Sequence, residues 1–88
     1  MDRQNKLTEL PNIGHVVAEK LNQVGISTPE ELRAIGTEQV FIRLQTIDET
    51  ACLSMLQALE GAVQGIRWHK LPKERKEELK EFMRLRRM

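Results

Sequence analysis

The chain has 88 residues, a formal net charge of +1, 40% hydrophobic residues and 3% aromatic residues. This length predicts one domain over residues 1–88, with a core built mainly from aliphatic side chains. No apolar run approaches the roughly 20 residues of a membrane-spanning helix, and the polar residues 1–6 do not resemble a secretory leader. Cys52 is the one cysteine, which excludes an internal disulfide. We therefore expect a cytoplasmic protein without a membrane association.

Charge is divided unevenly along the chain. Residues 70–88 include eight basic and four acidic residues, whereas residues 1–69 include six basic and nine acidic residues. The first part therefore carries a net charge of −3 and the last part +4. Nucleic-acid-binding domains usually have a clustered basic surface, so this distribution argues against an extensive nucleic-acid interface.

The first half of the chain predicts several short helices. A short helix over residues 2–9 is followed by a turn at 11–14 and a helix to Val24, which Gly25 ends as a left-handed cap. The inward face of that helix consists of Val17, Ala18, Leu21 and Val24. Residues 27–31 (STPEE) combine a hydroxyl cap, proline and acidic residues, which predicts the start of a further helix. Gly36 ends it.

The second half continues the helical pattern. A helix from Thr37 directs Val40, Phe41 and Leu44 inward, and the polar residues 48–50 separate it from the next helix. That helix, residues 50–64, has the longest apolar stripe, which is formed by Cys52, Met55, Leu56, Leu59, Ala62 and Val63. A short link over residues 66–71 leads to a charged C-terminal helix at about 72–87. No segment alternates with period two, so the fold class is all-α, a small bundle of five or six short helices.

The turn 10–14 (LPNIG) indicates an anion-binding site. Pro11 has a fixed φ, Asn12 tolerates a left-handed conformation and Gly14 has no Cβ. Such a turn leaves backbone amides pointing outward at a helix N-terminus, where a phosphate group is stabilised. The candidate nucleic-acid-binding residues are Asn12, Ile13, Gly14, His15 and Lys20. The alternative interpretation is that this turn only joins two helices.

The turn, followed by Ala18 and Leu21, resembles a helix-hairpin-helix motif. In that family the amides of a short turn hold a DNA phosphate without reading the base sequence. Asn12 stands where the commonest form of the motif has glycine, and it can adopt the left-handed conformation that this position requires.

A longer set of segments occurs in a characteristic order: 10–14 (LPNIG), 24–28 (VGIST), 31–36 (ELRAIG), 58–62 (ALEGA) and 68–72 (WHKLP). This succession is similar to the C-terminal domain of the TfoX/Sxy family of bacterial competence regulators. The resemblance implies a small helical domain with a helix-hairpin-helix-like unit, a regulatory role in DNA uptake and no enzymatic activity. Full-length members carry a further N-terminal domain, so the resemblance predicts a stand-alone copy of the C-terminal domain.

Few side chains suggest chemistry of other kinds. Two histidines and one cysteine match no metal-ligand spacing, and there is no catalytic triad or phosphate-binding loop with its lysine. We expect no enzymatic activity, no metal and no cofactor. Cys52 is predicted to be a buried, inert thiol on the apolar face of its helix. Glu60 is expected to act as a cap or to pair with a basic residue such as Arg67. Gly61 is expected to allow close helix packing, and Trp68 to fill the core.

The C-terminal end offers a second, smaller candidate contact. Arg84, Arg86 and Arg87 form a basic end that suits nucleic acid or an acidic protein, although cations at a helix C-terminus are also stabilised by the helix dipole. Phe82, Met83 and Leu85 either pack onto the core or form a self-association seam.

Two classes of function remain open. In the first, the turn holds DNA backbone without sequence specificity. In the second, the domain contacts a protein, such as a transcription regulator or a second copy of itself in a homodimer, and the turn has only a structural role.

Overall fold

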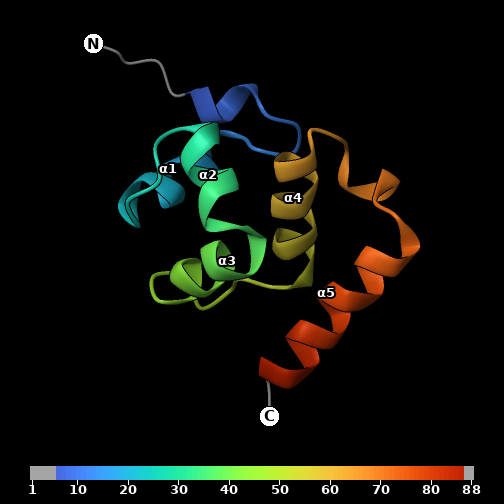
Figure 1. Ribbon diagram of the computed structural model, residues 1–88. Helices are drawn as coiled ribbons and strands as arrows, with labels where there is room; N and C mark the ends of the chain where they lie inside the picture. The colour runs from blue at the N-terminus through green and yellow to red at the C-terminus, as the bar shows by residue number, and fades with distance from the viewer. Residues whose placement is uncertain (1–5, 87–88) are drawn as a thin grey trace.

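The helix α4 (Leu53–Gln64) lies in the middle of the molecule, between α2 and α3 on one side and α5 on the other (Figure 1). The computed structural model describes residues 6–86, and every regular element in that range is a helix. In chain order these are η1 (Lys6–Glu9), α1 (His15–Gln23), α2 (Pro29–Ile35), α3 (Thr37–Gln45), α4, η2 (Trp68–Lys70) and α5 (Lys73–Arg86). The predicted all-α class is confirmed, although part of the first predicted helix, residues 2–5, lies outside the described residues.

The core is aliphatic, as the composition predicts. Every helix of the α series contributes at least one buried apolar side chain. The buried apolar residues are Leu7, Ile13, Ala18, Leu21, Ile26, Leu32, Val40, Phe41, Leu44, Leu56, Leu59, Ala62, Leu71, Leu79 and Met83. Phe41 meets Phe82 edge to face, with 6.3 Å between the ring centroids, so α5 packs back onto α3. None of the helices within residues 6–86 is both long and apolar enough to cross a bilayer.

Local signals explain most of the helix boundaries. The hydroxyl of Thr28 accepts a hydrogen bond from the Glu31 amide at 3.1 Å, and Pro29 is the first residue of α2. Gly25 and Gly65 follow α1 and α4 with φ of 89° and 78°, a conformation that glycine adopts without steric cost. These boundaries follow from the chemistry of two or three neighbouring residues.

The start of α4 differs from the prediction. Asp48 accepts hydrogen bonds from the amide and hydroxyl of Thr50, at 2.9 and 2.5 Å, and these bonds hold the segment in a turn. The helix therefore begins at Leu53 rather than near residue 50, and Cys52 is its N-cap residue. The prediction that Cys52 is buried was wrong, because a residue outside the first helical turn does not share the apolar face of α4. The thiol is exposed.

A charged network joins α5 to the body of the molecule. Arg75 forms ion pairs at 2.9 Å with both Glu60 of α4 and Glu38 of α3. Glu60 also accepts hydrogen bonds from Thr37 at 2.6 Å and Gln64 at 2.5 Å. The expected pairing of Glu60 with a basic residue is confirmed, but the partner is Arg75 rather than Arg67, because the first turn of α5 brings Arg75 to the carboxylate.

This network determines the ionisation of its members. Burial alone would raise the pKa of Glu60, but the hydrogen bonds from Arg75, Thr37 and Gln64 outweigh it and lower the pKa. Hydrogen bonds to Glu60, Glu38 and Glu78 raise the pKa of Arg75. Both groups stay charged, and their attraction holds three helices together.

Candidate functional site

The turn 10–14 is held against α4 and the segment that follows it by one side chain. Asn12 has a φ of 71° and is the one non-glycine residue with positive φ among residues 6–86. Its Nδ2 donates to the carbonyl oxygens of Ile66 at 3.0 Å and Ala58 at 3.4 Å, and its Oδ1 accepts from the Trp68 amide at 3.3 Å. Figure 1 shows this segment passing the C-terminal end of α4. The carboxamide thus faces the protein and holds the turn against the link.

Gly61 makes this contact feasible. A Cβ at this position would lie 2.5 Å from Asn12 Nδ2, 2.6 Å from the Ile66 oxygen and 3.2 Å from the Trp68 nitrogen. Such distances are shorter than packed atoms tolerate, so only glycine fits. The expected role of Gly61 in close packing is refined: its neighbours are Asn12 of the turn, Ile66 of the link and Trp68 at the start of η2.

The N-terminus of α1 opens toward solvent. Its N-cap residue, Gly14, is exposed and extended, and no side chain caps the first amides of the helix. His15 and Val16, the first two helical residues, are also exposed. Ile13 differs, because its side chain is buried and its amide donates to the Leu10 oxygen at 3.4 Å. Among the predicted residues, Gly14 and His15 therefore lie at the open helix end, and Ile13 belongs to the core.

Lys20 forms an ion pair with Asp48. Its Nζ lies 2.5 Å from Oδ2 of Asp48, a carboxylate that is 8% exposed. Hydrogen bonds from Lys20 and Thr50 lower the pKa of Asp48 to about 2. The pair joins α1 to the loop between α3 and α4, so the positive charge of Lys20 is balanced within the protein.

A pocket of about 330 Å³ lies beside the turn. It is lined by Asn12, Ser54, Gln57, Ala58, Arg67 and Trp68. The Trp68 side chain is 45% exposed and meets the His69 ring edge to face, at 5.8 Å between centroids. The prediction that Trp68 fills the core was wrong, because Leu71, which follows η2, enters the core in its place. Arg67 is exposed, and its guanidinium has no hydrogen-bonding or ionic partner within residues 6–86.

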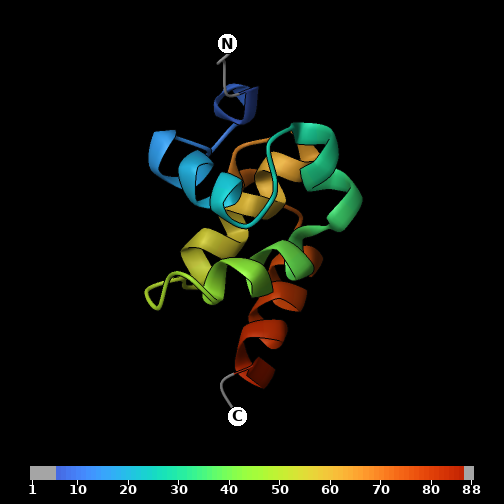
Figure 2. The ribbon, with the colours of Figure 1, turned by 90° about the vertical axis from the view of Figure 1, so that its left-hand side faces the viewer.

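The basic C-terminal end lies away from the turn. Figure 2 shows α5 running past α3 at the end of the molecule opposite to η1. Arg84 pairs with Glu81 at 2.5 Å, while Arg86 donates to Gln45 at 2.9 Å and lies 5.9 Å from the Phe82 ring centroid. Arg87 lies outside the described residues. The two candidate contacts therefore do not form one surface.

The apolar residues near this end are divided. Met83 is buried and Phe82 is partly buried against the core, whereas Leu85 is 55% exposed. Two of the three residues that were candidates for a self-association seam therefore pack onto the core, and Leu85 is left exposed.

Sequence reasoning missed the residues that form the pocket, among them Ser54, Gln57 and Arg67. Gln57 gave a usable signal: it is a polar residue within the apolar stripe of α4, and its side chain is 9% exposed. Arg67 gave none, because its neighbourhood is created by Asn12, which is distant in sequence. Within residues 6–86, no group of three or more His, Cys, Asp or Glu side chains is arranged to hold a metal ion.

Comparison with known proteins identifies several relatives. The family model of the TfoX C-terminal domain matches residues 3–83. Protein Sxy of Escherichia coli strain K12 is 33% identical over 79 residues, which cover 90% of this chain and 38% of Sxy, so the chain spans about two fifths of that relative. Two crystal forms from Listeria monocytogenes, a triclinic form of an uncharacterised protein and a tetragonal form of a protein of unknown function, are each 51% identical and have TM-scores of 0.88 and 0.87. Each match covers 90% of this chain, and 90% and 96% of the respective crystallised chains.

Proposed function

The chain belongs to the family of TfoX C-terminal domains, and on that premise we propose that it is a non-catalytic regulatory domain in bacterial competence or transcription control that contacts nucleic-acid backbone. The contact surface is the turn–link face, which comprises the turn 10–14, His15 and Val16 of α1, and residues 67–70. Binding there requires no base sequence, because backbone amides and cationic side chains recognise phosphate.

One observation carries this proposal: the N-terminus of α1 is exposed without a side-chain cap while the Asn12 side chain is turned inward. The first amides of a helix have no partner within the helix, and they carry a partial positive charge. An Asn side chain directed outward would obstruct an approaching phosphate. Because it is engaged by Ile66 and Trp68, the amides of the first turn of α1 stay accessible.

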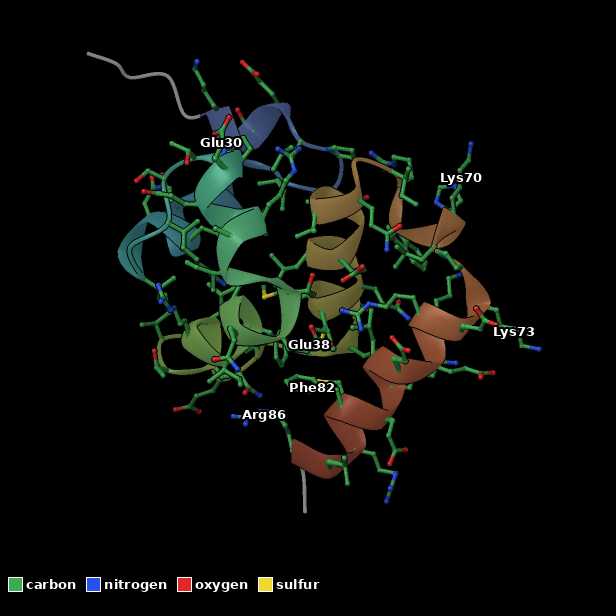
Figure 3. All side chains as sticks on the ribbon, in the orientation of Figure 1. Glu30, Glu38, Lys70, Lys73, Phe82 and Arg86 are labelled. Atoms are coloured by element: carbon green, nitrogen blue, oxygen red, sulfur yellow. The ribbon has the colours of Figure 1, made fainter. Side chains whose placement is uncertain are left out.

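The neighbouring link supplies positive charge. Arg67 is exposed and lines the pocket that Asn12 also lines, and His69 and Lys70 are exposed beside it. Figure 3 shows Lys70 pointing away from the body of the molecule. A duplex or single strand lying on the turn could therefore meet these side chains with a second phosphate.

The size of this surface limits the affinity. Exposed acids such as Glu9 and Glu19 lie on η1 and α1, close in sequence to the turn, and Lys20 is neutralised by Asp48. We therefore expect only one to three phosphate contacts. The logarithm of the binding constant falls by about 0.9 per contact for each tenfold rise in salt, so the salt dependence should be clear but shallow.

The test is binding of a fluorescently labelled duplex across a salt series, with the wild type and Gly14→Asp. Gly14 has open space where a Cβ would lie, so the variant should fold normally. Its carboxylate would occupy the helix N-terminus and repel phosphate, and binding should be lost. Gln39→Asp is the matched control, since it adds the same charge at an exposed position of α3. Absence of binding by the wild type at low salt and micromolar concentration would exclude the proposal for this chain.

Exposed apolar side chains favour a second candidate function, recognition of a protein. Val16 is 65% exposed and Trp68 is 45% exposed, and both belong to the turn–link face. Large exposed apolar residues mark protein interfaces when they cluster, and aromatic residues are common at the centres of such interfaces. Sedimentation of the wild type and Val16→Ser distinguishes self-association: a dimer that dissociates in the variant would support this function, and a monomer in both would exclude the homodimer.

A further inference from the structure

Gln57 is a buried amide without a protein partner. Its side chain is 9% exposed, it lines the pocket beside the turn, and it makes no hydrogen bond to protein within residues 6–86. No fully enclosed side-chain nitrogen or oxygen atom in this range lacks a partner, so the amide must reach accessible space. Its nitrogen and oxygen are therefore open to the space they border, where solvent or a ligand completes their hydrogen bonds. That space is the pocket.

The other groups around the pocket differ in chemistry. Ser54 lies three residues before Gln57, which puts both on the same face of α4. Arg67 offers an exposed guanidinium, and Trp68 offers the exposed part of an indole ring. A carboxamide donates and accepts side by side, as the edge of a base requires, while indole stacks on planar rings and guanidinium binds phosphate. Together these groups match a nucleobase carrying a phosphate.

The dimensions agree with a ligand of this size. A volume of about 330 Å³ is at the lower end of small-molecule sites, which begin at about 300 Å³. The single indole suits one base and not a row of stacked bases. A second aromatic platform would be needed to track a longer strand, and Phe41 and Phe82 pack in the core contact between α3 and α5 instead.

We propose that this pocket receives one unstacked base of single-stranded or locally opened nucleic acid. Gln57 hydrogen-bonds to the edge of the base, Trp68 stacks on its face, and Arg67 holds the adjacent phosphate. The inference rests on the proposed function, because the turn beside the pocket supplies the backbone contact. It adds a preference for unpaired over fully paired nucleic acid, since a base within a duplex cannot enter the pocket without leaving its stack.

The test compares two short single strands of equal length, one of mixed sequence and one abasic throughout. Trp68 is the one tryptophan, so its fluorescence reports on stacking directly. We expect the strand with bases to quench this fluorescence and the abasic strand to leave it unchanged. Gln57→Leu should weaken binding of the strand with bases about fivefold or more and leave binding of the abasic strand unaltered. Gln39→Leu makes the same chemical change on the exposed side of α3 and should have no effect.

The outcomes separate this inference from the proposed function. If both strands bind equally and Gln57→Leu has no effect, the pocket proposal is overturned while the backbone contact stands. A third outcome is that neither strand binds, but a free mononucleotide quenches Trp68 in the wild type and not in Gln57→Leu. The pocket then binds a free nucleotide, and the proposal that the base belongs to a nucleic acid is overturned. If neither the strands nor a mononucleotide bind, both proposals fail, and protein recognition is the remaining candidate function.

Discussion

The carboxamide of Asn12 occupies the space where the side chain of any other residue at position 61 would lie. Nδ2 of Asn12 would be 2.5 Å from a Cβ on Gly61, and the same Nδ2 donates to the Ile66 carbonyl at 3.0 Å. These two residues, 49 positions apart in the numbering, therefore depend on each other. Together they position the turn beside the pocket and leave the N-terminus of α1 open.

Replacement of Gly61 by alanine should destabilise the protein. Alanine normally favours a helix over glycine by about 1 kcal/mol, but here the added methyl group overlaps Asn12 and the Ile66 carbonyl. We expect a net loss of about 1–3 kcal/mol in the free energy of unfolding, measured by urea denaturation. Ser54→Ala, an exposed position on the same helix, is the control and should change the stability little. An unchanged stability of Gly61→Ala would contradict the close contact.

Two substitutions at Asn12 separate its backbone role from its side-chain role. Asn12→Gly keeps the positive φ of 71° but removes three hydrogen bonds, so the free energy of unfolding should fall by about 1–2 kcal/mol. Asn12→Ala also forces alanine into the left-handed region, which should cost about 1 kcal/mol more. Thermal denaturation of the two variants gives the difference. Equal stability of glycine and alanine would show that the backbone conformation contributes nothing.

Loss of Arg75 should detach α5 from the body. Arg75→Met leaves the carboxylate of Glu60, 6% exposed, without its cationic partner. Removing one member of a buried ion pair is strongly destabilising, and since Arg75 is partly exposed we expect about 2–4 kcal/mol. Arg84→Met, which breaks an exposed pair with Glu81 on the same helix, should cost at most about 1 kcal/mol. Equal effects of the two substitutions in urea denaturation would refute the central role of Arg75.

The ion pair between Lys20 and Asp48 should make stability depend on acid pH. The pKa of Asp48 is about 2 in the folded protein against 3.8 in the unfolded chain, so the unfolded state binds more protons between these values. The free energy of unfolding should therefore decrease as the pH falls from about 3.8 toward about 2, and this carboxyl should have no effect above about pH 5.

Urea denaturation at several acid pH values tests this dependence. Lys20→Met removes the main cause of the shift and should reduce the slope, whereas Lys80→Met, an exposed position on α5, should not. Parallel pH profiles for the wild type and Lys20→Met would contradict the assignment.

Gly14→Asp should stabilise the fold while it abolishes anion binding. Gly14 is an N-cap residue with extended backbone and no side-chain cap, and aspartate at such a position accepts bonds from the first amides. We expect a gain of about 0.3–1 kcal/mol in the free energy of unfolding. Thermal denaturation measures it. Gln39→Asp adds the same charge in the first turn of α3 but not at an N-cap, so the gain of Gly14→Asp beyond that of Gln39→Asp reports the N-cap bonds. Destabilisation by Gly14→Asp would mean that the helix end is already satisfied in another way.

Sequence patterns predicted the helices well because the signals are local. The hydroxyl of Thr28 before Pro29, the glycines after α1 and α4, and the spacing of Val40, Phe41 and Leu44 each depend on neighbours within one helical turn. The start of α4 was missed because the turn formed by Asp48 and Thr50 competes with the helix for the same residues.

Part of the candidate site could also be predicted. The turn and the left-handed Asn12 are visible in the order of residues 10–14, and the structure confirms the positive φ. What Asn12 touches could not be predicted, because Ala58, Ile66 and Trp68 are brought to it only when the turn 10–14 meets the end of α4. The pocket with Gln57 and Arg67 depends on the same meeting.

By itself, the sequence determined the family, the all-α class, the aliphatic core and the special turn, since each follows from residue type and spacing along the chain. The tertiary structure decided which charged side chains form ion pairs and which stay exposed to solvent. Lys20 is neutralised by Asp48 and Glu60 by Arg75, while Arg67 is left exposed and Trp68 is displaced from the core by Leu71. Such pairings join residues far apart in sequence, and they depend on distances that only the packed helices establish.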